Sequence, residues 1–357
     1  MLFRSNIVID TTAPTISSVT PASSSTIGPG FSANYTLSEA VGSGTITFTR
    51  TGGSVDGATH IYNFGNGDKT SGSHSITRAT LESGFGNSLV NGAVYTMTVS
   101  ATDVALNAAT PVSNTSITYD TTAPTISSVT PASSSTVGSG FSANYTLSEA
   151  VASGTITFTR TGGSADGATH IYNFASGDKT TGAHSITRAT LESGFGNSLV
   201  NGAVYTMTVS ATDAASNAAT PVSNTLITYD TTPPDTNLDS KPTSPSNDPT
   251  AEFGFTSTET PSTFECQLDD GLWVGCESPQ TYTGLSDGNH TFKVRATDAA
   301  GNTGDEVSYT WVIITSKPVI SSVTPASSST VGSGFTANYT LSKTVASGSI
   351  TFTRTGG

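Results

Sequence analysis

The sequence predicts an all-β protein whose domains are β-sandwiches that follow one another as an extended rod. Thr, Val, Ile and Tyr alternate with Ser and Thr over long runs, which is typical of strands with one buried face, and no long helical pattern is present. The sequence also contains internal repeats, because Asp10, Asp120 and Asp230 begin similar segments that are spaced 110 residues apart. Only 11% of the residues are charged, but the modest net charge and the regular apolar pattern are unlike a disordered chain.

The repeats define the domain organisation. Residues 10–119 and 120–229 align without gaps and differ at 11 positions, whereas the unit that follows has a different sequence. "SNIVID" at the start resembles "SNTSITYD" before Asp120, so we expect the sequence to be an internal part of a longer protein. The expected parts are a last strand of a preceding domain (1–9), a first repeat (10–119), a second repeat (120–229), a domain of a second subtype (230–316) and a truncated repeat (317–357).

Each full repeat contains seven short strand patterns separated by turn sequences such as "NGDK" and "LVNGA". In the first repeat we expect strands over 15–20, 31–38, 45–50, 60–64, 74–81, 94–102 and 112–119. The alternation in the sixth strand places Tyr95, Met97, Val99 and Ala101 on one face. Seven alternating strands in about 100 residues predict an immunoglobulin-like sandwich. A β-helix is the competing repeat fold, but its repeats are much shorter.

The second-subtype domain has the same strand phase in its last two strands. The expected inward residues are Phe292, Val294 and Ala296 in one strand, and Val307, Tyr309, Trp311 and Ile313 in the other.

Three phrases resemble a known family. "DTTAP" at the start of a repeat, "LSEAV" after the second strand and "ATDxxxN" after the sixth are similar to the bacterial immunoglobulin-like (Big-type) repeats of large secreted and cell-surface, adhesin-like proteins. "STFECQLDDGLWVGCESP" and "LSDGNHTFKVRATDAAGN" resemble a second subtype from such proteins. The resemblance implies an extracellular location, a tandem stalk whose domains are each other's partners, cell adhesion, and a cell-surface protein or glycan as ligand.

Charge and hydropathy exclude other classes. A net charge of −13 and a pI of about 4.5 argue against nucleic acid, which requires a basic surface. No apolar run reaches the roughly 18 residues of a membrane span, and "MLFRSNIVID" is unlike a signal peptide.

Polar residues recur at one end of every expected sandwich. If the strands run alternately up and down, the start of the first strand and the ends of the second and sixth meet at one pole. The residues there are Asp10, Glu39, Asp103 and Asn107 in the first repeat, Asp120, Glu149, Asp213 and Asn217 in the second, and Asp230, Glu259, Asp298 and Asn302 in the third unit.

Two hypotheses explain this polar set. Three carboxylates repel one another unless a cation lies between them, and carboxylate and amide oxygens are ligands that Ca²⁺ prefers, so each pole is a candidate Ca²⁺ site that stiffens the joint. Alternatively, the Asp and Asn side chains only cap turns through hydrogen bonds to the backbone. In the truncated repeat Ile314 replaces the first Asp and Lys343 replaces the Glu. The two acidic residues are lost together, which favours the Ca²⁺ hypothesis over the capping hypothesis. The joint before this repeat is then expected to lack an ion.

Cys266 and Cys276 flank a hairpin turn at Asp269-Asp270-Gly271. Counting across the turn places the two cysteines opposite each other on one face, so a cross-strand disulfide is feasible. Two buried free thiols or a metal pair are the alternatives, and no further Cys or His pair at ligand spacing supports the metal. A disulfide indicates an oxidising compartment.

The sequence shows no convincing active site. Four of the five histidines are duplicates on expected strand faces, and His290 aligns with Tyr95. Neither a G-x-S-x-G nor an H-E-x-x-H motif is present. We therefore expect no catalysis and no cofactor other than Ca²⁺. The main hypothesis is a stalk or spacer of an adhesin-like protein. The alternative is an accessory module array of a secreted hydrolase or carbohydrate-binding protein, for which Trp273 is the one exposed aromatic signal.

Overall fold

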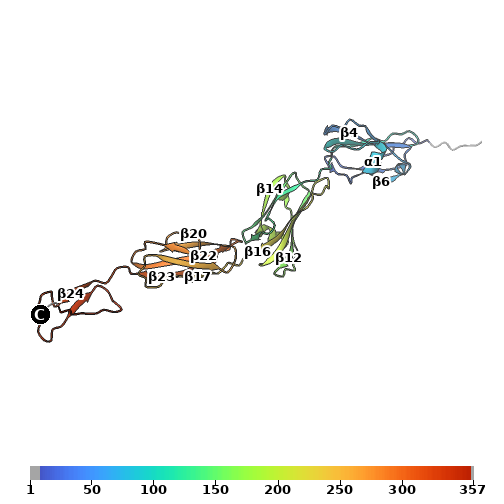
Figure 1. Cartoon of the computed structure of the whole chain (residues 1–357). Coiled ribbons are helices and arrows are strands. Elements are labelled where there is room, and N and C mark those ends of the chain that lie inside the picture. Colours follow the sequence, from blue (N-terminus) through green and yellow to red (C-terminus); the bar gives the residue numbers. More distant parts are fainter. Residues whose placement is uncertain (1–8, 355–357) are drawn as a thin grey trace, which may run out of the picture. The chain divides into compact units, whose positions relative to one another are not determined.

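The computed structural model describes residues 9–354, so the expected strand at 1–9 lies outside the described residues except for Ile9. The chain divides into two compact units, Met1–Thr231 and Thr232–Gly357, which are described separately. Strands dominate both units, and each repeat folds into its own pair of sheets (Figure 1). The prediction of tandem β-sandwich domains is thus confirmed.

The first repeat packs a three-stranded sheet on a five-stranded sheet. The first sheet has the order β1 (Ile16–Thr20), β3 (Ser32–Leu37) and β6 (Gly72–Thr77). The second has the order β2 (Thr26–Ile27), β8 (Val112–Tyr119), β7 (Ala93–Thr102), β4 (Ser43–Gly53) and β5 (His60–Asn63). All neighbours are antiparallel except β2 and β8, whose parallel pairing moves the chain from one sheet to the other.

The second repeat has the same two sheets. They are β9 (Ile126–Thr130), β11 (Ser142–Leu147) and β14 (Gly182–Thr187), and β10 (Thr136–Val137), β16 (Val222–Tyr229), β15 (Ala203–Thr212), β12 (Ser153–Gly163) and β13 (His170–Asn173). In both repeats the core lies between the sheets. Tyr95, Met97, Val99 and Ala101 are buried there, as the alternation predicts.

One expected strand is partly wrong. Residues 74–81 were expected to form a single strand, but β6 ends at Thr77 and α1 (Arg78–Phe85) follows. The Thr77 hydroxyl accepts from the Thr80 N–H, and Gly86 ends the helix with φ at 74°. Leu81 anchors the helix in the core, so a local cap and one apolar contact outweigh the strand pattern.

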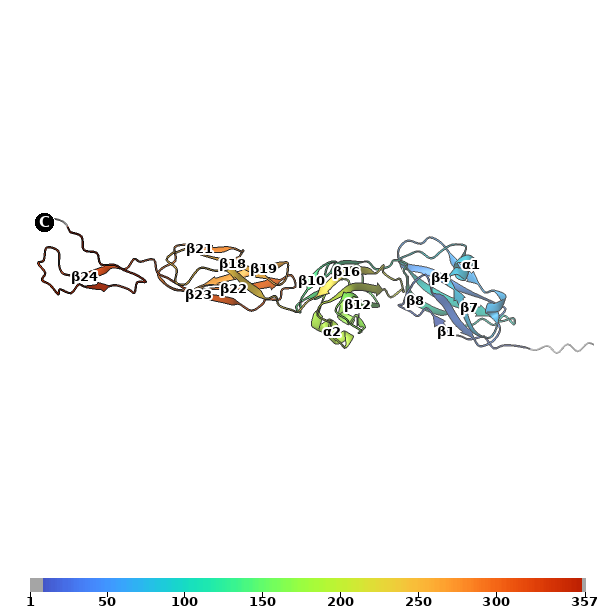
Figure 2. The same cartoon turned by 60° about the horizontal axis from the view of Figure 1, so that its bottom comes forward.

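The second repeat forms the matching helix α2 (Arg188–Phe195), and short 3-10 turns precede both helices at η1 (Asn66–Lys69) and η2 (Ser176–Lys179). Figure 2 shows α1 and α2 each on its own repeat. No helix in residues 9–354 is long and apolar enough to cross a membrane.

The third domain runs from β17 to β23 and has a smaller sandwich. Its sheets are β17 (Thr236–Ser240), β18 (Ala251–Ser257) and β21 (Gln280–Tyr282), and β20 (Val274–Cys276), β19 (Ser262–Leu268), β22 (Gly288–Asp298) and β23 (Val307–Ile313). Phe292, Val294 and Ala296 are buried as expected, and Trp311 is the largest fully buried side chain.

The third domain contains the disulfide Cys266–Cys276. The expected register is wrong by two residues, because Cys266 pairs with Val274 and Cys276 pairs with Phe264. The cysteines are therefore diagonal neighbours on one face, with Cα atoms 5.8 Å apart, and the bond is still within reach. The turn after Leu268 takes two residues in the left-handed region, which sets this register.

Only two short strands form in the last segment, β24 (Ile320–Thr324) and β25 (Asn338–Leu341), which pair with each other. Their apolar side chains, such as Ile320 and Tyr339, are exposed, whereas the matching Ile16 and Tyr35 of the first repeat are buried. The difference arises because the described part of this segment has no second sheet to cover that face.

Candidate metal site and the linker beside it

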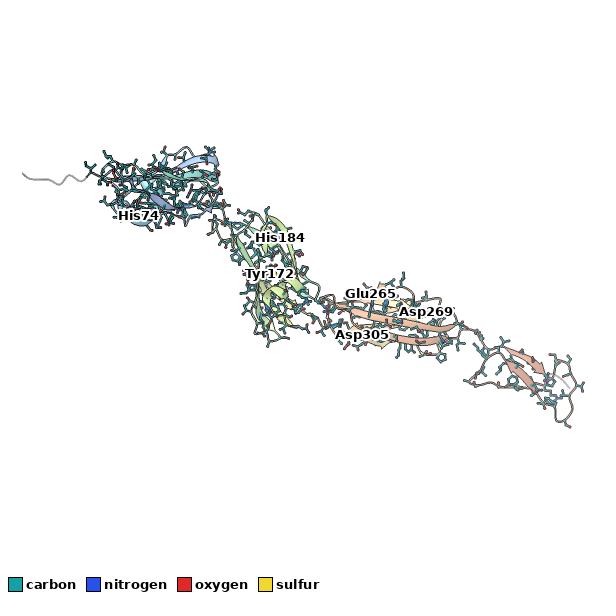
Figure 3. All side chains as sticks on the ribbon, turned by 180° about the vertical axis from the view of Figure 1, so that it is seen from behind. His74, Tyr172, His184, Glu265, Asp269 and Asp305 are labelled. Atoms are coloured by element: carbon teal, nitrogen blue, oxygen red, sulfur yellow. A yellow bond between two sulfur atoms is a disulfide. The ribbon has the colours of Figure 1, made fainter. Side chains whose placement is uncertain are left out.

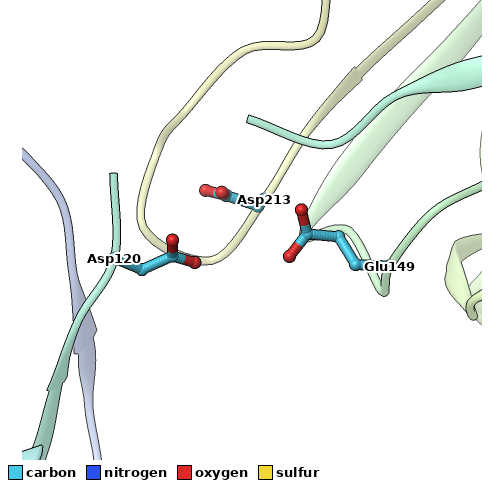
Figure 4. A group of neighbouring side chains, drawn as sticks. All are labelled: Asp120, Glu149 and Asp213. Carbon is cyan, nitrogen blue, oxygen red and sulfur yellow. The ribbon is translucent and has the colours of Figure 1, made fainter. Parts of the chain in front are cut away.

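The second repeat brings three predicted carboxylates together. Asp120 follows β8, Glu149 follows β11 and Asp213 follows β15, and one carboxylate oxygen of each lies within 4.8 Å of the others. Figure 4 shows the three groups facing a common point. The up-and-down strand order predicted this meeting, because alternating strands end at the same pole.

The Glu149 carboxyl responds to the two charges beside it. Burial, and then the charges of Asp120 and Asp213, raise the pKa of Glu149 above its usual value. No hydrogen bond to the Glu149 carboxylate is found within residues 9–354. A cation at this point would relieve the repulsion from Asp120 and Asp213, which adds to the effect of burial on this pKa.

Turn capping accounts for the other members of the set. The Asp120 carboxylate accepts from the Thr122 N–H at 2.9 Å. Asn217 donates to Asp213 twice, from its backbone N–H at 2.8 Å and from its side-chain amide at 2.9 Å. These are the hydrogen bonds that the capping hypothesis expects, and they leave Glu149 unexplained.

The corresponding residues of the first repeat keep the caps without forming a cluster. Asp10 accepts from the Thr12 N–H at 3.0 Å, and Asn107 donates to Asp103 at 2.8 Å. Burial raises the pKa of Asp103, but the hydrogen bonds from Asn107, together with the backbone hydrogen bonds from Ala105 and Leu106, outweigh it and lower the pKa overall. Glu39, Asp10 and Asp103 do not make a three-carboxylate group in the described part of the chain. Asp10 is exposed, whereas the backbone N–H of Asp120 is anchored to the carbonyl of Ile27.

In the third domain Glu259 and Asp298 offer carboxylate oxygens within 4.8 Å of each other. Asn302 caps Asp298 as Asn217 caps Asp213, with two hydrogen bonds of 2.9 Å. Asp230 belongs to the first unit, where its N–H donates to the carbonyl of Val137 at 3.0 Å.

The last segment differs as its sequence suggested. Ile314 occupies the position of the first Asp, and Lys343 that of the Glu. The Lys343 ammonium donates to the carbonyl of Ser316 and lies 3.3 Å from its hydroxyl. This joint therefore carries a cationic side chain where the second repeat carries Glu149.

A residue that the sequence reading overlooked holds each linker. Asn91 accepts from the Thr121 N–H at 2.7 Å and donates to the Thr122 hydroxyl at 2.8 Å. Two further residues occupy the same corner: Asn201 accepts from Thr231 at 2.7 Å, and Asp287 accepts from Thr315 at 2.8 Å. We call this contact the exit clamp. "LVNGA" contains this residue within an expected turn, and "LSDGN" lies in the stretch that resembles the second subtype, but neither pattern indicates a contact with the linker.

The two repeats also approach closely beside the linker. A Cβ on Gly28 would lie 2.1 Å from the carbonyl oxygen of Ala215, so only glycine fits there. Ala215 is buried, whereas its counterpart Ala105 is exposed. This contact therefore depends on the neighbouring repeat.

Each repeat contains a buried polar network that the sequence did not reveal. The Asp56 carboxylate binds His60 Nε2 at 2.6 Å and accepts from the Tyr95 hydroxyl. The side chains of Asp56 and His60 are 2% and 1% exposed, and His60 Nδ1 has no partner among the described residues. The counterparts in the second repeat are Asp166, His170 and Tyr205. His74 and His184, labelled in Figure 3, lie outside these networks.

Trp273 is half-buried in the third domain. The Arg295 guanidinium lies over its ring, 4.3 Å from the centroid, and is held by Glu265 at 2.8 Å. Figure 3 labels Glu265 on this domain. One face of the ring is therefore covered, which weakens its reading as a sugar-stacking platform.

A scan against family models found no match, and a search of curated proteins found none either. Solved structures with similarity include fibronectin(III)-like modules of CbhA from Clostridium thermocellum (14% identity, 53% of this chain and 93% of that chain, TM-score 0.31). The FN1–FN3 domains of chicken CNTN1 are 11% identical (84% and 100% covered, TM-score 0.32). Dimeric latent PorU from Porphyromonas gingivalis is 12% identical (82% and 32% covered, TM-score 0.21). These TM-scores are low, so we take the fold from the sheet topology.

Proposed function

We propose that this chain is a non-catalytic spacer in a surface-exposed or secreted adhesin-like protein of a bacterium, with Ca²⁺ at the joint between its first two repeats. The observation that supports this proposal is the hydrogen bonding of the linker Asp120–Thr122. Its three backbone N–H groups all have acceptors: the Ile27 carbonyl, Asn91 and the Asp120 carboxylate. A linker held in this way limits bending, which is what a spacer needs.

Both neighbouring repeats contribute to this linker. Asn91 of the first repeat binds it from one side, and Asn217 of the second donates to the Asp120 carbonyl at 3.1 Å. Near-identical repeats would then place near-identical joints along a longer array. The uncharged Ser, Thr and Gly surface of the chain suits an inert spacer in an extracellular setting.

The ion would act at the point that Asp120, Glu149 and Asp213 face. Carboxylate oxygens suit Ca²⁺, and further ligands would come from backbone carbonyls or water. Extracellular Ca²⁺ modules bind with Kd of roughly 10⁻⁴ to 10⁻³ M, and at about ten times Kd the gain is only about 1.4 kcal/mol. The ion is therefore expected to stiffen the joint more than it stabilises either repeat.

The test compares Glu149→Gln with Glu39→Gln in the full chain, with Ca²⁺ or with chelator. We expect Ca²⁺ to raise the melting temperature of the repeats in the wild type and in Glu39→Gln, and to leave the melting temperature of the repeats in Glu149→Gln unchanged. In chelator, Glu149→Gln should be slightly more stable than wild type because it removes one repelling charge. Isothermal calorimetry should show a site that the Glu149 variant alone loses.

Two outcomes would count against the ion. If the two variants respond equally to Ca²⁺, the ion does not bind at this cluster. If the wild type does not respond, Asp120 and Asp213 only cap turns beside Glu149. The spacer itself is tested separately through the linker, as described in the Discussion.

The buried Asp–His–Tyr networks do not favour an enzyme. A general base must reach the proton that it removes, and Asp56 and His60 are enclosed by the core. The alternative of accessory modules in a secreted hydrolase or carbohydrate-binding protein would gain support if the chain bound polysaccharide through Trp273. Binding that a Trp273→Ala variant abolishes would favour that alternative over the spacer.

A further inference from the structure

Both ring nitrogens of the buried His290 face oxygen atoms. Nδ1 lies 2.6 Å from the Asp269 carboxylate, and Nε2 lies 2.8 Å from the carbonyl of Ser286. A carbonyl and an ionised carboxylate can only accept hydrogen bonds. Both contacts are therefore satisfied together only when His290 carries two protons and a positive charge.

The surroundings of His290 support this charged form. The Ser286 hydrogen bond, and also the hydrogen bond and charge of Asp269, raise the pKa of His290 against the lowering effect of burial. The Trp311 ring packs from β23 with centroids 5.4 Å apart and carries no charge. Asp269, labelled in Figure 3, is the titratable group in contact with the ring.

Three further charged groups belong to the same region. Asp270, next to Asp269, is engaged by Lys293 at 3.4 Å, and Glu306 lies 3.6 Å from the same ammonium. Lys293 lies on β22 three residues beyond His290, so it points to the other face of the strand. None of these three contacts the imidazole.

The residue after Ser286 is the exit clamp of the third domain. One carboxylate oxygen of Asp287 accepts from the Thr315 N–H at 2.8 Å and from its hydroxyl, and the other accepts from the Ser316 N–H at 3.4 Å. His290 thus fixes the loop at Ser286, and the adjacent residue of that loop fixes the segment that leaves the domain.

We propose that His290 is a proton-operated latch, which holds the exit segment Thr315–Ser316 through Ser286 and Asp287 when protonated and loosens it when neutral. Loss of one proton leaves a nitrogen lone pair against an oxygen lone pair, so one of the two His290 contacts must open. If the Ser286 contact opens, the loop that carries Asp287 loses its fixed position.

The first two repeats lack this latch and provide an internal control. At the same corner Tyr95 accepts from the Val90 N–H at 2.9 Å and donates to Asp56, and Asn91 holds the linker as a neutral amide. Burial, and then the hydrogen bond to Asp56, raise the pKa of Tyr95 far above physiological pH. The Tyr95 hydroxyl should therefore keep its proton between pH 5.5 and 8, and the hydrogen bond of His60 in this network goes to Asp56, not to the loop that carries Asn91.

The test is hydrogen exchange by mass spectrometry on the full chain at pH 5.5 and pH 8.0, with rates corrected for intrinsic exchange. Peptides that cover Thr315–Ser316 should lose protection by about tenfold at pH 8.0, the size of one hydrogen bond to a charged group. Peptides that cover Thr121–Thr122 should keep theirs. A His290→Gln variant should remove the pH dependence at Thr315–Ser316 only, and Asp287→Asn should preserve it, since the clamp remains and the latch is intact.

The wild type alone also decides the question if His290→Gln does not fold. The midpoint of the protection change should coincide with the titration midpoint of the His290 ring, followed by NMR of its carbon-bound protons. Protection at Thr315–Ser316 that is equal at both pH values, that changes equally at Thr121–Thr122, or that follows a different midpoint would each overturn the latch.

Discussion

The first two repeats and the third domain fasten the same corner of the sandwich with different chemistry. In the repeats a tyrosine bridges a buried aspartate and the loop before the exit clamp. In the third domain a histidine bridges an aspartate and the matching loop. The position is dictated by the fold, because the sixth strand begins there beside the loop that precedes it. The side chain decides whether the corner responds to protons.

The two kinds of domain also stabilise their cores differently. Each repeat adds a short helix with a buried leucine, whereas the third domain has fewer strands and no helix in its described residues. The third domain adds a disulfide beside its core of Phe253, Phe292 and Trp311 rings, whereas the aromatic clusters of the repeats have no covalent cross-link. A smaller sandwich buries less surface, so a covalent cross-link contributes more to its stability.

The largest expected effect is loss of the buried network in one repeat. Asp56→Ala leaves the His60 ring and the Tyr95 hydroxyl buried without their shared partner, and we expect the first repeat to lose about 2–6 kcal/mol, since each buried polar group left without a partner costs about 1–3 kcal/mol. Calorimetry of the full chain should show one repeat transition moving down while the other remains. Asp166→Ala should do the same to the second repeat. An unchanged thermogram would mean that the network contributes little to stability.

Reduction of the disulfide should affect the third domain alone. Opening a loop of this length costs roughly 2–3 kcal/mol on the chain-entropy model, so the transition of that domain should fall in reducing buffer. The repeats contain no cysteine and serve as the control within the same chain. A reductant that lowers every transition equally, or none, would contradict this assignment.

A smaller effect is expected from pH. Because the pKa of His290 is raised in the folded protein, its contribution is complete below the unfolded value of about 6.5 and is lost as the pH rises through the folded value. The third domain should therefore melt at lower temperature at pH 8 than at pH 6. A hydrogen bond to a charged group, at about 1.5 kcal/mol, corresponds to roughly 6–12 °C. His290→Gln should remove the difference, and a melting temperature that rises with pH would contradict the charged histidine.

The smallest effect on stability, and the most direct test of the spacer, concerns the joint between the repeats. Gly28→Ala inserts a methyl group against the Ala215 carbonyl and should broaden the distance distribution between spin labels on the two repeats. Both repeats should melt almost as before. Gly30→Ala meets no atom within 4 Å and is the matched control. Equal distributions for the two variants would argue against a joint held by this contact.

Periodicity alone was sufficient for much of the fold. The alternation in the sixth strand predicts which of its side chains are buried, and the exact repeat predicts two copies of one sandwich. The meeting of Asp120, Glu149 and Asp213 also followed from counting strands. The failures were local: the Thr77 cap and Gly86 turn part of an expected strand into a helix, and two left-handed residues after Leu268 shift the cysteine register.

The sequence by itself determined the strand pattern, the repeat and the residues available at each pole, because alternation and spacing depend only on the order of residues along the chain. Only the tertiary structure decided which of them act together. Asn91 and Thr121 are 30 residues apart, and Asp269 and His290 are 21 apart. Such contacts arise where loops from different strands meet, and their geometry depends on turn lengths and on one or two backbone angles. The sandwich can therefore be predicted from the sequence. The exit clamp, the His290 latch and the carboxylate cluster form only when the loops pack together in the folded protein.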